Sequence, residues 1–316
     1  MKEINFLGLG FEVGQEQKGL HRSHEHAKRY FPFLKKHGLE IIDQGAFVPE
    51  QQTCKKIYQQ QQLSKINWSD YKNACTRISQ LLQLPEVLLN WGGDHSVALA
   101  TVGGFCNENP EGYVLWIDAH ADLNLPDFSR TGNLHGMPLS ILMNLQNVGT
   151  LYLPWIKNSL KPQKLIYLGI RDLDPFEKEM IVKLGIRAYT TQDVRRRGID
   201  RIADEILKIV SGSPLHISFD IDSLSPEYAP ATGVPVANGL CIQDLKTLGE
   251  VLSEHPGLCS MDIVEINPAL GKKSDVFQTY IAALIFLLSV LKKGEIYDGL
   301  SRSAQAINPA PLESRP

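Results

Sequence analysis

Short apolar segments alternate with amphipathic segments along most of this chain of 316 residues. The short segments have the length and composition of strands, and the amphipathic segments have the spacing of helices. This alternation predicts an α/β fold in which helices cover both faces of a parallel sheet. Strands are expected at residues 4–11, 39–47, 86–93, 113–120, 164–172, 186–193, 215–222 and 258–267, and helices at 63–83, 135–146, 200–210 and 242–254.

No repeat, low-complexity tract or flexible linker divides the chain, so residues 1–316 are expected to form a single domain. The longest apolar segment, residues 280–291, is too short for a bilayer, which needs about 20 residues. We expect it to be a buried C-terminal helix. The apolar N-terminus has no small-residue cleavage site after it and is expected to be the first strand. No membrane association is expected.

The composition is that of an ordinary globular protein, with 43% hydrophobic and 21% charged residues. A net charge of -3 gives no basic field for a polyanion, so no nucleic-acid partner is expected. The five cysteines are scattered and form no C-x-x-C pair, which favours a reduced, cytoplasmic setting over a zinc or redox site. They are Cys54, Cys75, Cys106, Cys241 and Cys259.

The apolar run from Val114 to Ile117 leads directly into three polar side chains, Asp118, His120 and Asp122. In an extended chain, residues two and four apart point to the same side, so the three groups are expected to converge. Carboxylates near a buried strand end cost several kcal/mol unless a cation neutralises them. The segment therefore predicts a metal site.

A second cluster repeats this pattern, with Asp220 and Asp222 at the end of the strand expected at 215–222. His95 stands in "GGDHS", after another strand. Carboxylates with some imidazole suit Mn²⁺ or Mg²⁺ better than structural zinc. Six ligands are too many for one ion with an open position, but they suit two ions about 3.5 to 4 Å apart that hold a hydroxide between them. The candidate ligands are His95, Asp118, His120, Asp122, Asp220 and Asp222.

Either cluster alone has an ordinary explanation, because a D-x-H or D-x-D at a strand end commonly forms a helix cap, a turn or an ion pair. Asp94, between Gly93 and His95, is interpreted as an N-cap or a supporting group and is not counted among the ligands. Polar segments end five of the expected strands, and ligands of parallel sheets lie at the carboxyl ends of strands. We expect all five to meet at one edge: "NWGGDHS", "DAHADLN", "RDLDPFE", "DIDSLSP" and "DIVEINP".

The ordered motifs "GGDHS", "DAHADLN", "GNLHGMP", "FDIDSLSP", "PATGVP" and "DIVEINP" resemble those of the ureohydrolase superfamily, most closely the arginase family. The resemblance implies a three-layer αβα sandwich with an eight-stranded parallel sheet, and two Mn²⁺ ions per subunit. It implies that Asp118 and Asp220 bridge the ions. One ion would bind His95, Asp118, Asp122 and Asp220, and the other His120, Asp118, Asp220 and Asp222.

The same resemblance implies which groups bind an amino-acid substrate. In the arginase family an Asn after the metal motif and an S-G-N triplet bind the α-carboxylate, and the matching positions here are Asn124, Thr131 and Asn133. Thr131 departs from the usual Ser by one methyl group. The α-ammonium would bind Asp174, supported by Asp172 and Glu177, although "RDLDPFE" could also simply cap the next helix.

At the reacting end, a guanidinium is best held by a carboxylate that accepts two parallel N–H bonds, and the resemblance assigns this role to Glu265. His135 is the candidate for proton transfer, because imidazole titrates near neutral pH; a His satisfied by backbone at a helix start is the alternative. Thr232 matches a Thr near the guanidinium, but its position also fits an ordinary loop. The candidate catalytic residues are His135, Glu265 and Asp122, the last also as a metal ligand.

The N-terminal region departs from the family pattern, because the Gly-rich segment that usually ends in G-P is replaced by "GQEQKGLHRSHEHAKRY". This difference affects the expected local loop and not the metal ligands. His21, His24 and His26 in this segment are interleaved with charged residues, so we interpret them as the solvated face of a helix.

The activity implied is hydrolysis of L-arginine to L-ornithine and urea, by a homo-oligomer that is a trimer or hexamer. Another ureohydrolase, acting on agmatine, guanidinobutyrate or a formimino compound, is an alternative that the groups at Asn124, Asn133 and Asp174 disfavour. A non-catalytic relative is a second alternative, but all six ligand positions are filled. A zinc deacetylase-like hydrolase would need one metal and paired histidines, whereas "NLHG" offers a single His.

Overall fold

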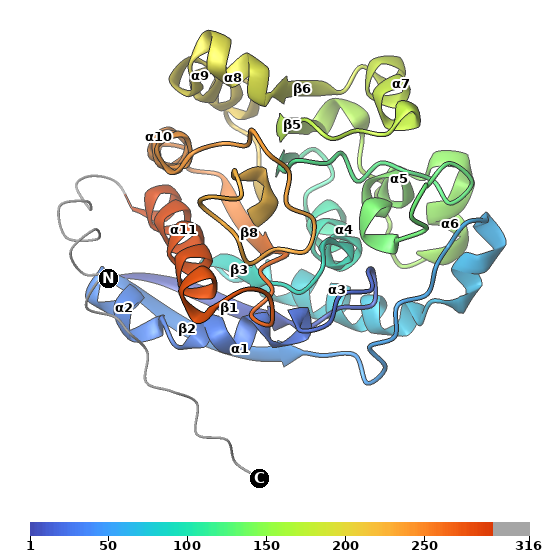
Figure 1. Cartoon of the computed structure of the whole chain (residues 1–316), viewed down its shortest axis with the longest axis horizontal. Coiled ribbons are helices and arrows are strands. Elements are labelled where there is room, and N and C mark those ends of the chain that lie inside the picture. Colours follow the sequence, from blue (N-terminus) through green and yellow to red (C-terminus); the bar gives the residue numbers. More distant parts are fainter. Residues whose placement is uncertain (293–316) are drawn as a thin grey trace.

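All eight expected strands form, and they lie in one parallel sheet with the order β2-β1-β3-β8-β7-β4-β5-β6 (Figure 1). The computed structural model describes residues 1–292. The sequence prediction of an eight-stranded α/β fold is confirmed, while a single domain over 1–316 stays a prediction that extends beyond the described residues. The strands are β1 Lys2–Leu9, β2 Leu39–Phe47, β3 Val87–Trp91, β4 Tyr113–Ile117, β5 Leu165–Ile170, β6 Arg187–Thr190, β7 Leu215–Asp220 and β8 Leu258–Val264.

Helices cover both faces of the sheet, and each face has its own apolar core. One core joins the sheet to α1, α2, α9, α10 and α11, and the other joins it to α3, α4, α5 and α7. The α-helices are α1 Ser23–Lys28, α2 Phe31–Lys36, α3 Trp68–Leu81, α4 Ala98–Glu108, α5 Pro138–Leu142, α6 Val148–Tyr152, α7 Pro175–Leu184, α8 Thr191–Arg197, α9 Ile199–Val210, α10 Ile242–Leu252 and α11 Lys273–Leu291. Short 3-10 helices are η1 Leu20–Arg22, η2 Gln60–Lys65, η3 His95–Val97, η4 Leu134–Gly136, η5 Leu145–Asn147, η6 Pro162–Lys164 and η7 Ile221–Ser223.

Strand β4 is apolar at every position, and its place in the sheet shows why. Leu115 and Ile117 belong to the core on one face of the sheet, and Val114 and Trp116 belong to the core on the other. A strand in the middle of a parallel sheet is buried on both sides, so a continuous apolar run is required. The run stops where the strand leaves the sheet, and the next residue, Asp118, is fully buried.

Two of the expected helices are broken in the structure. The segment 63–83 divides into η2 and α3, because Ile66 has an extended backbone between them. The segment 135–146 divides into η4, α5 and η5, since Asn144 and Gln146 adopt left-handed conformations with φ of 56° and 52°. Asn accepts this conformation more readily than most residues, so it ends a helix at little cost.

Helix α11 begins earlier than residue 280 and has 19 residues, which by length and composition alone would suffice to cross a membrane. In the fold it is a core helix. Tyr280, Phe286 and Leu287 are fully buried, and the helix packs against α10. The expectation of a buried C-terminal helix is confirmed for the described residues.

The interpretation of the N-terminal histidines as a solvated face is wrong for His24. Its side chain is buried, with 4% of the residue exposed, and lies against β1. The reason is the absence of side chains at Gly8 and Gly10: a Cβ at Gly8 would stand 2.5 Å from the His24 ring. His26 is half-buried and stacks on Tyr280, at 6.2 Å between ring centroids.

Tyr280 joins three elements through buried contacts. Its ring is parallel to that of Trp91 on β3, and its hydroxyl donates to the backbone carbonyl of Ser23 at 2.9 Å. The Ser23 hydroxyl in turn accepts from the Trp91 indole N–H at 3.0 Å. Helix α1, strand β3 and helix α11 are thus connected by one small polar network inside the core.

Replacement of Tyr280 by Phe is therefore expected to lower the free energy of unfolding by about 1–3 kcal/mol, because a buried carbonyl loses its donor. Urea-induced unfolding followed by circular dichroism measures the change. Tyr58→Phe, at a half-exposed tyrosine, is the control and should differ by less than about 0.5 kcal/mol from the parent. Equal stability of the Tyr280→Phe and parent proteins would contradict the role given to this network.

Candidate active site

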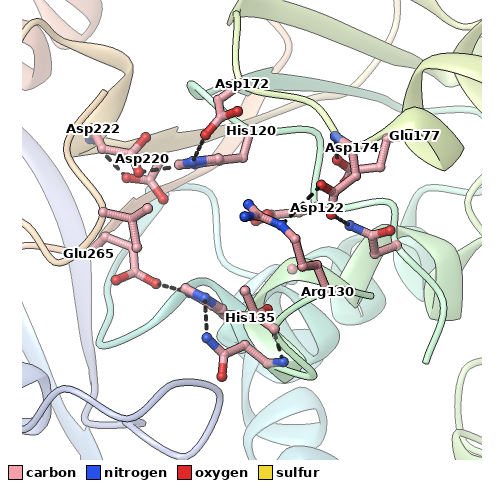
Figure 2. A pocket seen from close by; sticks show the side chains of 15 residues that line it. His120, Asp122, Arg130, His135, Asp172, Asp174, Glu177, Asp220, Asp222 and Glu265 are labelled. Atoms are coloured by element: carbon pink, nitrogen blue, oxygen red, sulfur yellow. Dashed lines mark hydrogen bonds and ion pairs between the residues drawn. The ribbon is translucent and has the colours of Figure 1, made fainter. Parts of the chain in front are cut away.

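Five polar segments meet at one edge of the sheet, as the sequence predicted. They follow β3, β8, β7, β4 and β5, which are consecutive in the sheet, and because all pairs are parallel their carboxyl ends lie on the same side. A pocket of about 140 Å³ opens at this edge (Figure 2). Its lining consists of His120, Asp122, Asn124, Arg130, Thr131, Asn133, His135, Gly136, Asp172, Asp174, Glu177, Asp220, Asp222, Val234 and Glu265.

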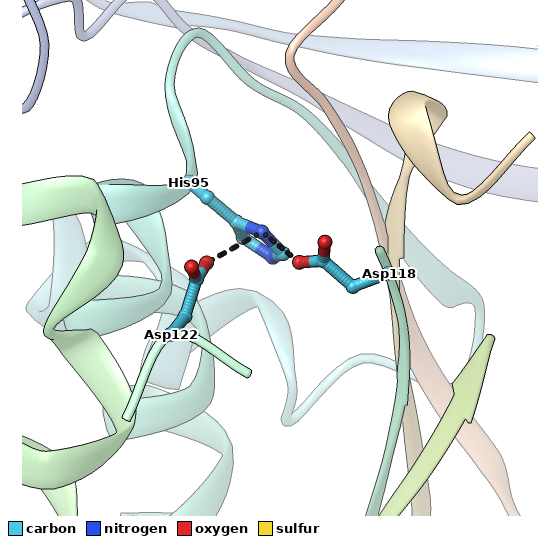
Figure 3. Close-up of side chains that lie close together, drawn as sticks. All are labelled: His95, Asp118 and Asp122. Atoms are coloured by element: carbon cyan, nitrogen blue, oxygen red, sulfur yellow. Dashed lines mark ion pairs between the residues drawn. The ribbon is translucent and has the colours of Figure 1, made fainter. Parts of the chain in front are cut away.

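The deepest group is centred on His95, at the start of η3 (Figure 3). Its Nδ1 lies 3.0 Å from Asp118 Oδ2 and 3.1 Å from both Asp122 Oδ2 and Asp220 Oδ2. This nitrogen is buried and has no hydrogen-bond partner among the described residues. A ring nitrogen that faces three carboxylate oxygens without a hydrogen bond is an arrangement that fits a divalent cation.

A second group shares Asp118 with the first. The Nδ1 of His120 lies 3.4 Å from Asp118 Oδ1 and 3.2 Å from Asp222 Oδ2. The two oxygens of Asp118 therefore face different histidines, which suits the bridging role implied for it. Asp220 contacts His95 through Oδ2, and its Oδ1 accepts the backbone N–H of Asp222 at 2.9 Å, just as Asp118 Oδ1 accepts that of His120 at 2.7 Å. Bridging by Asp118 and Asp220 stays a prediction.

The polar groups converge by a route that differs from the one expected. Strand β4 ends at Ile117, and Asp122 has a left-handed backbone with φ of 49°, so the segment is a turn and not an extended chain. Asp222 lies in η7, one turn beyond the end of β7. Alternation along a strand is therefore the wrong reason for the convergence, although the side chains do meet.

Burial and neighbouring charges shift the pKa values of these carboxyl groups. Burial raises the pKa of Asp222 to about 6, against the opposing effect of His120, and raises the pKa of Asp220 well above its usual value. Although burial opposes it, the pKa of Asp118 is lowered, because the rings of His120 and His95 lie 3.4 and 3.0 Å from its two oxygens. Raised pKa values are the response expected of buried carboxyl groups that lie close to one another.

His135 and Glu265 form a pair on another side of the pocket (Figure 2). His135 Nδ1 lies 2.9 Å from Glu265 Oε1, and the same oxygen accepts the backbone N–H of His95 at 2.8 Å. Although burial opposes it, the hydrogen bond to Glu265 raises the pKa of His135. Glu265 has a left-handed backbone with φ of 62°, a conformation that tends to occur at functional sites.

The groups predicted to bind an amino acid lie at the pocket mouth. The Asn124 amide donates to Asp174 Oδ2 at 3.0 Å. Glu177 accepts the backbone N–H groups of Leu123 and Asp174, which ties the metal-ligand turn to the start of α7. Asp174 thus also caps α7, as the alternative interpretation held.

Asp172 and Thr232 lie at the edge of this group. Asp172 lines the rim of the pocket, and its Oδ2 lies 3.8 Å from His120 Nε2. Thr232 does not line the pocket, but its backbone pairs with Ile266, the neighbour of Glu265, and its buried hydroxyl has no hydrogen-bond partner in the described part of the chain. A contact between Thr232 and the substrate stays a prediction.

The N-terminal segment that departs from the family pattern packs directly behind the pocket. The Gly14 N–H donates to Asp94 Oδ2 at 2.7 Å, and the Gly14 carbonyl accepts the N–H of His135 at 3.2 Å. A Cβ at Gly14 would stand 2.5 Å from Asp94 Oδ1, so this position requires glycine. Asp94 itself accepts the Ser96 N–H as the N-cap of η3, in agreement with its predicted role.

Comparison with known proteins identifies the family. The family model described as "Arginase family" matches residues 15–291. The chain belongs to the arginase family.

Individual relatives agree with this assignment. A hepatic arginase from Aquarana catesbeiana is 32% identical over 279 residues, which cover 86% of each chain. The arginase structure from Bacillus caldovelox superposes with a TM-score of 0.83 at 28% identity, over 94% of this chain and 100% of that one. An arginase from Entamoeba histolytica, determined in complex with L-ornithine, has a TM-score of 0.79 at 25% identity and covers 92% and 99% of the two chains. The predicted family and enzyme class, a hydrolase acting on a guanidino group, are confirmed.

Sequence reasoning missed three residues of this arginase-family site. Trp116 donates its indole N–H to Asp118 Oδ2 at 3.0 Å and stacks on the His95 ring at 4.0 Å, so it orients two candidate ligands. Arg171 donates to the backbone carbonyls of Asp222 and Val236 at 2.8 and 2.7 Å. Arg130 lines the pocket mouth. The adjacency of Trp116 to the metal motif was a visible signal, whereas the other contacts depend on the fold.

The His95 group predicts metal binding that depends on Asp122. Asp122→Ala is expected to weaken Mn²⁺ binding by roughly tenfold or more in calorimetric titration, since a ligand carries more of the affinity than its supporting groups. Asp127→Ala, an exposed acid in the same loop, is the matched control and should bind like the parent. Equal affinities of the Asp122→Ala and parent proteins would show that this group does not bind the ion.

Metal affinity is also expected to depend on pH. An ion binds the ionised carboxylate, and burial raises the pKa of Asp222 to about 6, so affinity should fall as pH drops through about 6. Titrations with Mn²⁺ at about pH 7.5 and 5.5, in buffers of different ionisation enthalpy, measure the affinity and the protons released. Equal affinity at both pH values, with no proton release, would contradict the proposed coordination by these carboxylates.

Proposed function

We propose that this pocket hydrolyses L-arginine to L-ornithine and urea, with two Mn²⁺ ions held by His95, Asp118, His120, Asp122, Asp220 and Asp222. The observation that carries the proposal is the meeting of two His and Asp groups at the floor of a pocket whose mouth holds Asn124 and Asp174. Membership of the arginase family supports the reaction. Such a pocket can hold a guanidinium at its floor and an amino-acid head group at its mouth.

Two divalent ions held by these six residues would supply hydroxide near neutral pH, because bound ions lower the pKa of water. Glu265 fixes the guanidinium: its Oε1 already accepts two N–H groups from the protein, which leaves Oε2 as the acceptor for substrate. The bidentate contact expected from the sequence therefore requires Oε1 to accept a third donor or to release His135.

His135 supplies the proton that the reaction needs. Nucleophilic attack on the guanidinium carbon gives a tetrahedral species, and the side-chain nitrogen of ornithine must gain a proton before its bond to that carbon breaks. Glu265 raises the pKa of His135, so the imidazolium form is available at neutral pH. A general acid whose pKa lies near the working pH is effective in this step.

The residues at the pocket mouth bind the amino-acid head group of the substrate, and we assign their roles from their charges and hydrogen-bonding groups. Asp174, a carboxylate beside the Asn124 amide, receives the α-ammonium. The α-carboxylate binds between Asn124, Thr131 and Asn133, where the Thr131 hydroxyl already accepts the backbone N–H of Asn133 at 3.3 Å and can donate its own hydrogen. Asp172 and Glu177 support this end of the pocket from the rim and from α7.

We also propose that the protein is a cytoplasmic homo-oligomer. The free cysteines, three of them only half-buried, agree with a reducing compartment. The oligomer rests on the resemblance to arginases alone. Size-exclusion chromatography with light scattering tests it, and a monomer would contradict it.

Urea release tests the proposed reaction. The Mn²⁺-loaded protein, freed of excess metal, should release urea rapidly from L-arginine and at least roughly 100-fold more slowly from agmatine and guanidinobutyrate, because both lack the α-amino acid head group. Asp122→Ala is the inactive control. Preference for agmatine would instead indicate another ureohydrolase, and metal binding without turnover of any of the three compounds would indicate a non-catalytic relative.

The role of His135 predicts a change in pH dependence. Asn in place of His135 removes the acid but preserves a polar side chain, so kcat should fall by roughly 100-fold or more with little change in KM. The fall of kcat at high pH, where the parent His135 loses its proton, should disappear in the variant. A full pH profile of kcat measures this, and a profile of unchanged shape would assign the proton transfer to another group.

A further inference from the structure

The geometry points to Arg130 as the residue that binds the α-carboxylate of the substrate by charge and so selects an amino acid over its decarboxylated analogue. This inference rests on the proposed function, since it concerns the head group of the same substrate. It goes beyond the neutral hydrogen-bonding groups that the family pattern provides. Arg130 was not identified from the sequence motifs.

The charge of the pocket creates the need for such a residue. Seven of its lining side chains are carboxyl groups. Three of them are proposed metal ligands whose charge the ions would balance, and four acids remain beyond them, namely Asp172, Asp174, Glu177 and Glu265. Among the described residues that line the pocket, Arg130 is the only Arg or Lys. An acidic pocket attracts a guanidinium but repels a carboxylate, and without a cation it would favour agmatine, which has no carboxylate. One arginine at the mouth reverses this preference, because it attracts the carboxylate and repels a second positive charge.

The loop that carries Arg130 is held in place on both sides of that residue. The Ser129 hydroxyl accepts the N–H of Gly132 at 3.0 Å, and the Thr131 hydroxyl accepts the N–H of Asn133. Phe128 stacks on Phe176 of α7, with 4.3 Å between ring centroids and 9° between ring planes. The loop is thereby fixed beside the start of α7, where Asp174 lies.

The guanidinium of Arg130 lies inside the mouth, near the carboxylate of Asp174 (Figure 2). Its Nε is 3.8 Å from Asp174 Oδ1, too far for a hydrogen bond, and its side chain is 82% exposed. A loose pair of this kind is weak. An amino-acid head group can enter between the two residues, with its ammonium on Asp174 and its carboxylate on Arg130. One weak contact is then replaced by two charge-assisted ones.

The neutral groups of the mouth can donate hydrogen bonds to a carboxylate but bring no positive charge. The Asn124 amide donates to Asp174 at 3.0 Å, and Asn133 Oδ1 accepts from Lys56 at 2.7 Å. Lys56 lies behind Asn133, does not line the pocket, and is paired with Glu16 at 3.0 Å. Arg130 is the charged donor that lines the pocket itself.

The experiment compares substrates with and without the carboxylate in parent, Arg130→Gln, Arg130→Lys and Arg196→Gln proteins. Arg196 is the matched control, because it is 73% exposed and paired with Asp193 outside the pocket. For L-arginine, Arg130→Gln should raise KM roughly tenfold, the loss of one charge-assisted hydrogen bond at an exposed site, with kcat within about twofold. For L-argininamide and agmatine, KM should stay the same or fall. Arg130→Lys should be intermediate, and Arg196→Gln should match the parent.

Binding of L-ornithine and of 1,4-diaminobutane by calorimetry gives a second readout that needs no turnover. Arg130→Gln should weaken ornithine binding roughly tenfold and leave the diamine unchanged. An unchanged KM for arginine, or an equal loss for arginine and argininamide, would overturn the inference and show a merely structural loop. A parent that releases no urea, yet binds ornithine in an Arg130-dependent manner, would contradict only the proposed reaction. A parent that neither turns over arginine nor binds ornithine would contradict both.

Discussion

The structure depends on the convergence of buried carboxyl groups at the carboxyl ends of five adjacent parallel strands. Asp118 and Asp220 are almost completely buried, together with His95, and their charges have no water to stabilise them. A group of this kind costs several kcal/mol unless a cation balances it. Stability and function therefore make opposite demands on these residues. The sheet must fold around buried carboxyl groups whose charges are balanced only when a metal is bound. Trp116 and Ser218 limit the cost by holding Asp118 and His95 through one hydrogen bond each.

The rest of the pocket follows from the same excess of negative charge. A substrate whose reacting end is a cation is attracted to the floor, and one whose other end is a zwitterion needs both signs of charge at the mouth. In the proposed binding mode Asp174 provides the negative group and Arg130 the positive one, on two segments that Glu177 and the Phe128–Phe176 stack hold together. This mode makes discrimination between related guanidino compounds depend on a few charges at the edge of the sheet.

Most of the sheet could be predicted because each strand is a local pattern, as in the run from Val114 to Ile117, which is apolar at every position. The candidate ligands could be predicted because they follow these runs directly. The features of the fold and the site that could not be predicted depend on contacts between segments far apart in the chain. The left-handed backbones of Asp122 and Glu265, the bonds from Arg171 to Asp222, and the burial of His24 against Gly8 have no signature in the nearby sequence. For Thr232 the role near the substrate stays a prediction, since the fold pairs its backbone with Ile266, next to Glu265, while its side chain does not line the pocket.

The central claim is that two metal ions share Asp118. Anomalous diffraction from crystals grown with Mn²⁺ tests it most directly, because manganese can be located independently of any assumption about the site. The account predicts two peaks about 3.5 to 4 Å apart, one beside His95 and one beside His120, with Asp118 between them. A single peak, or peaks that do not contact Asp118, would contradict it.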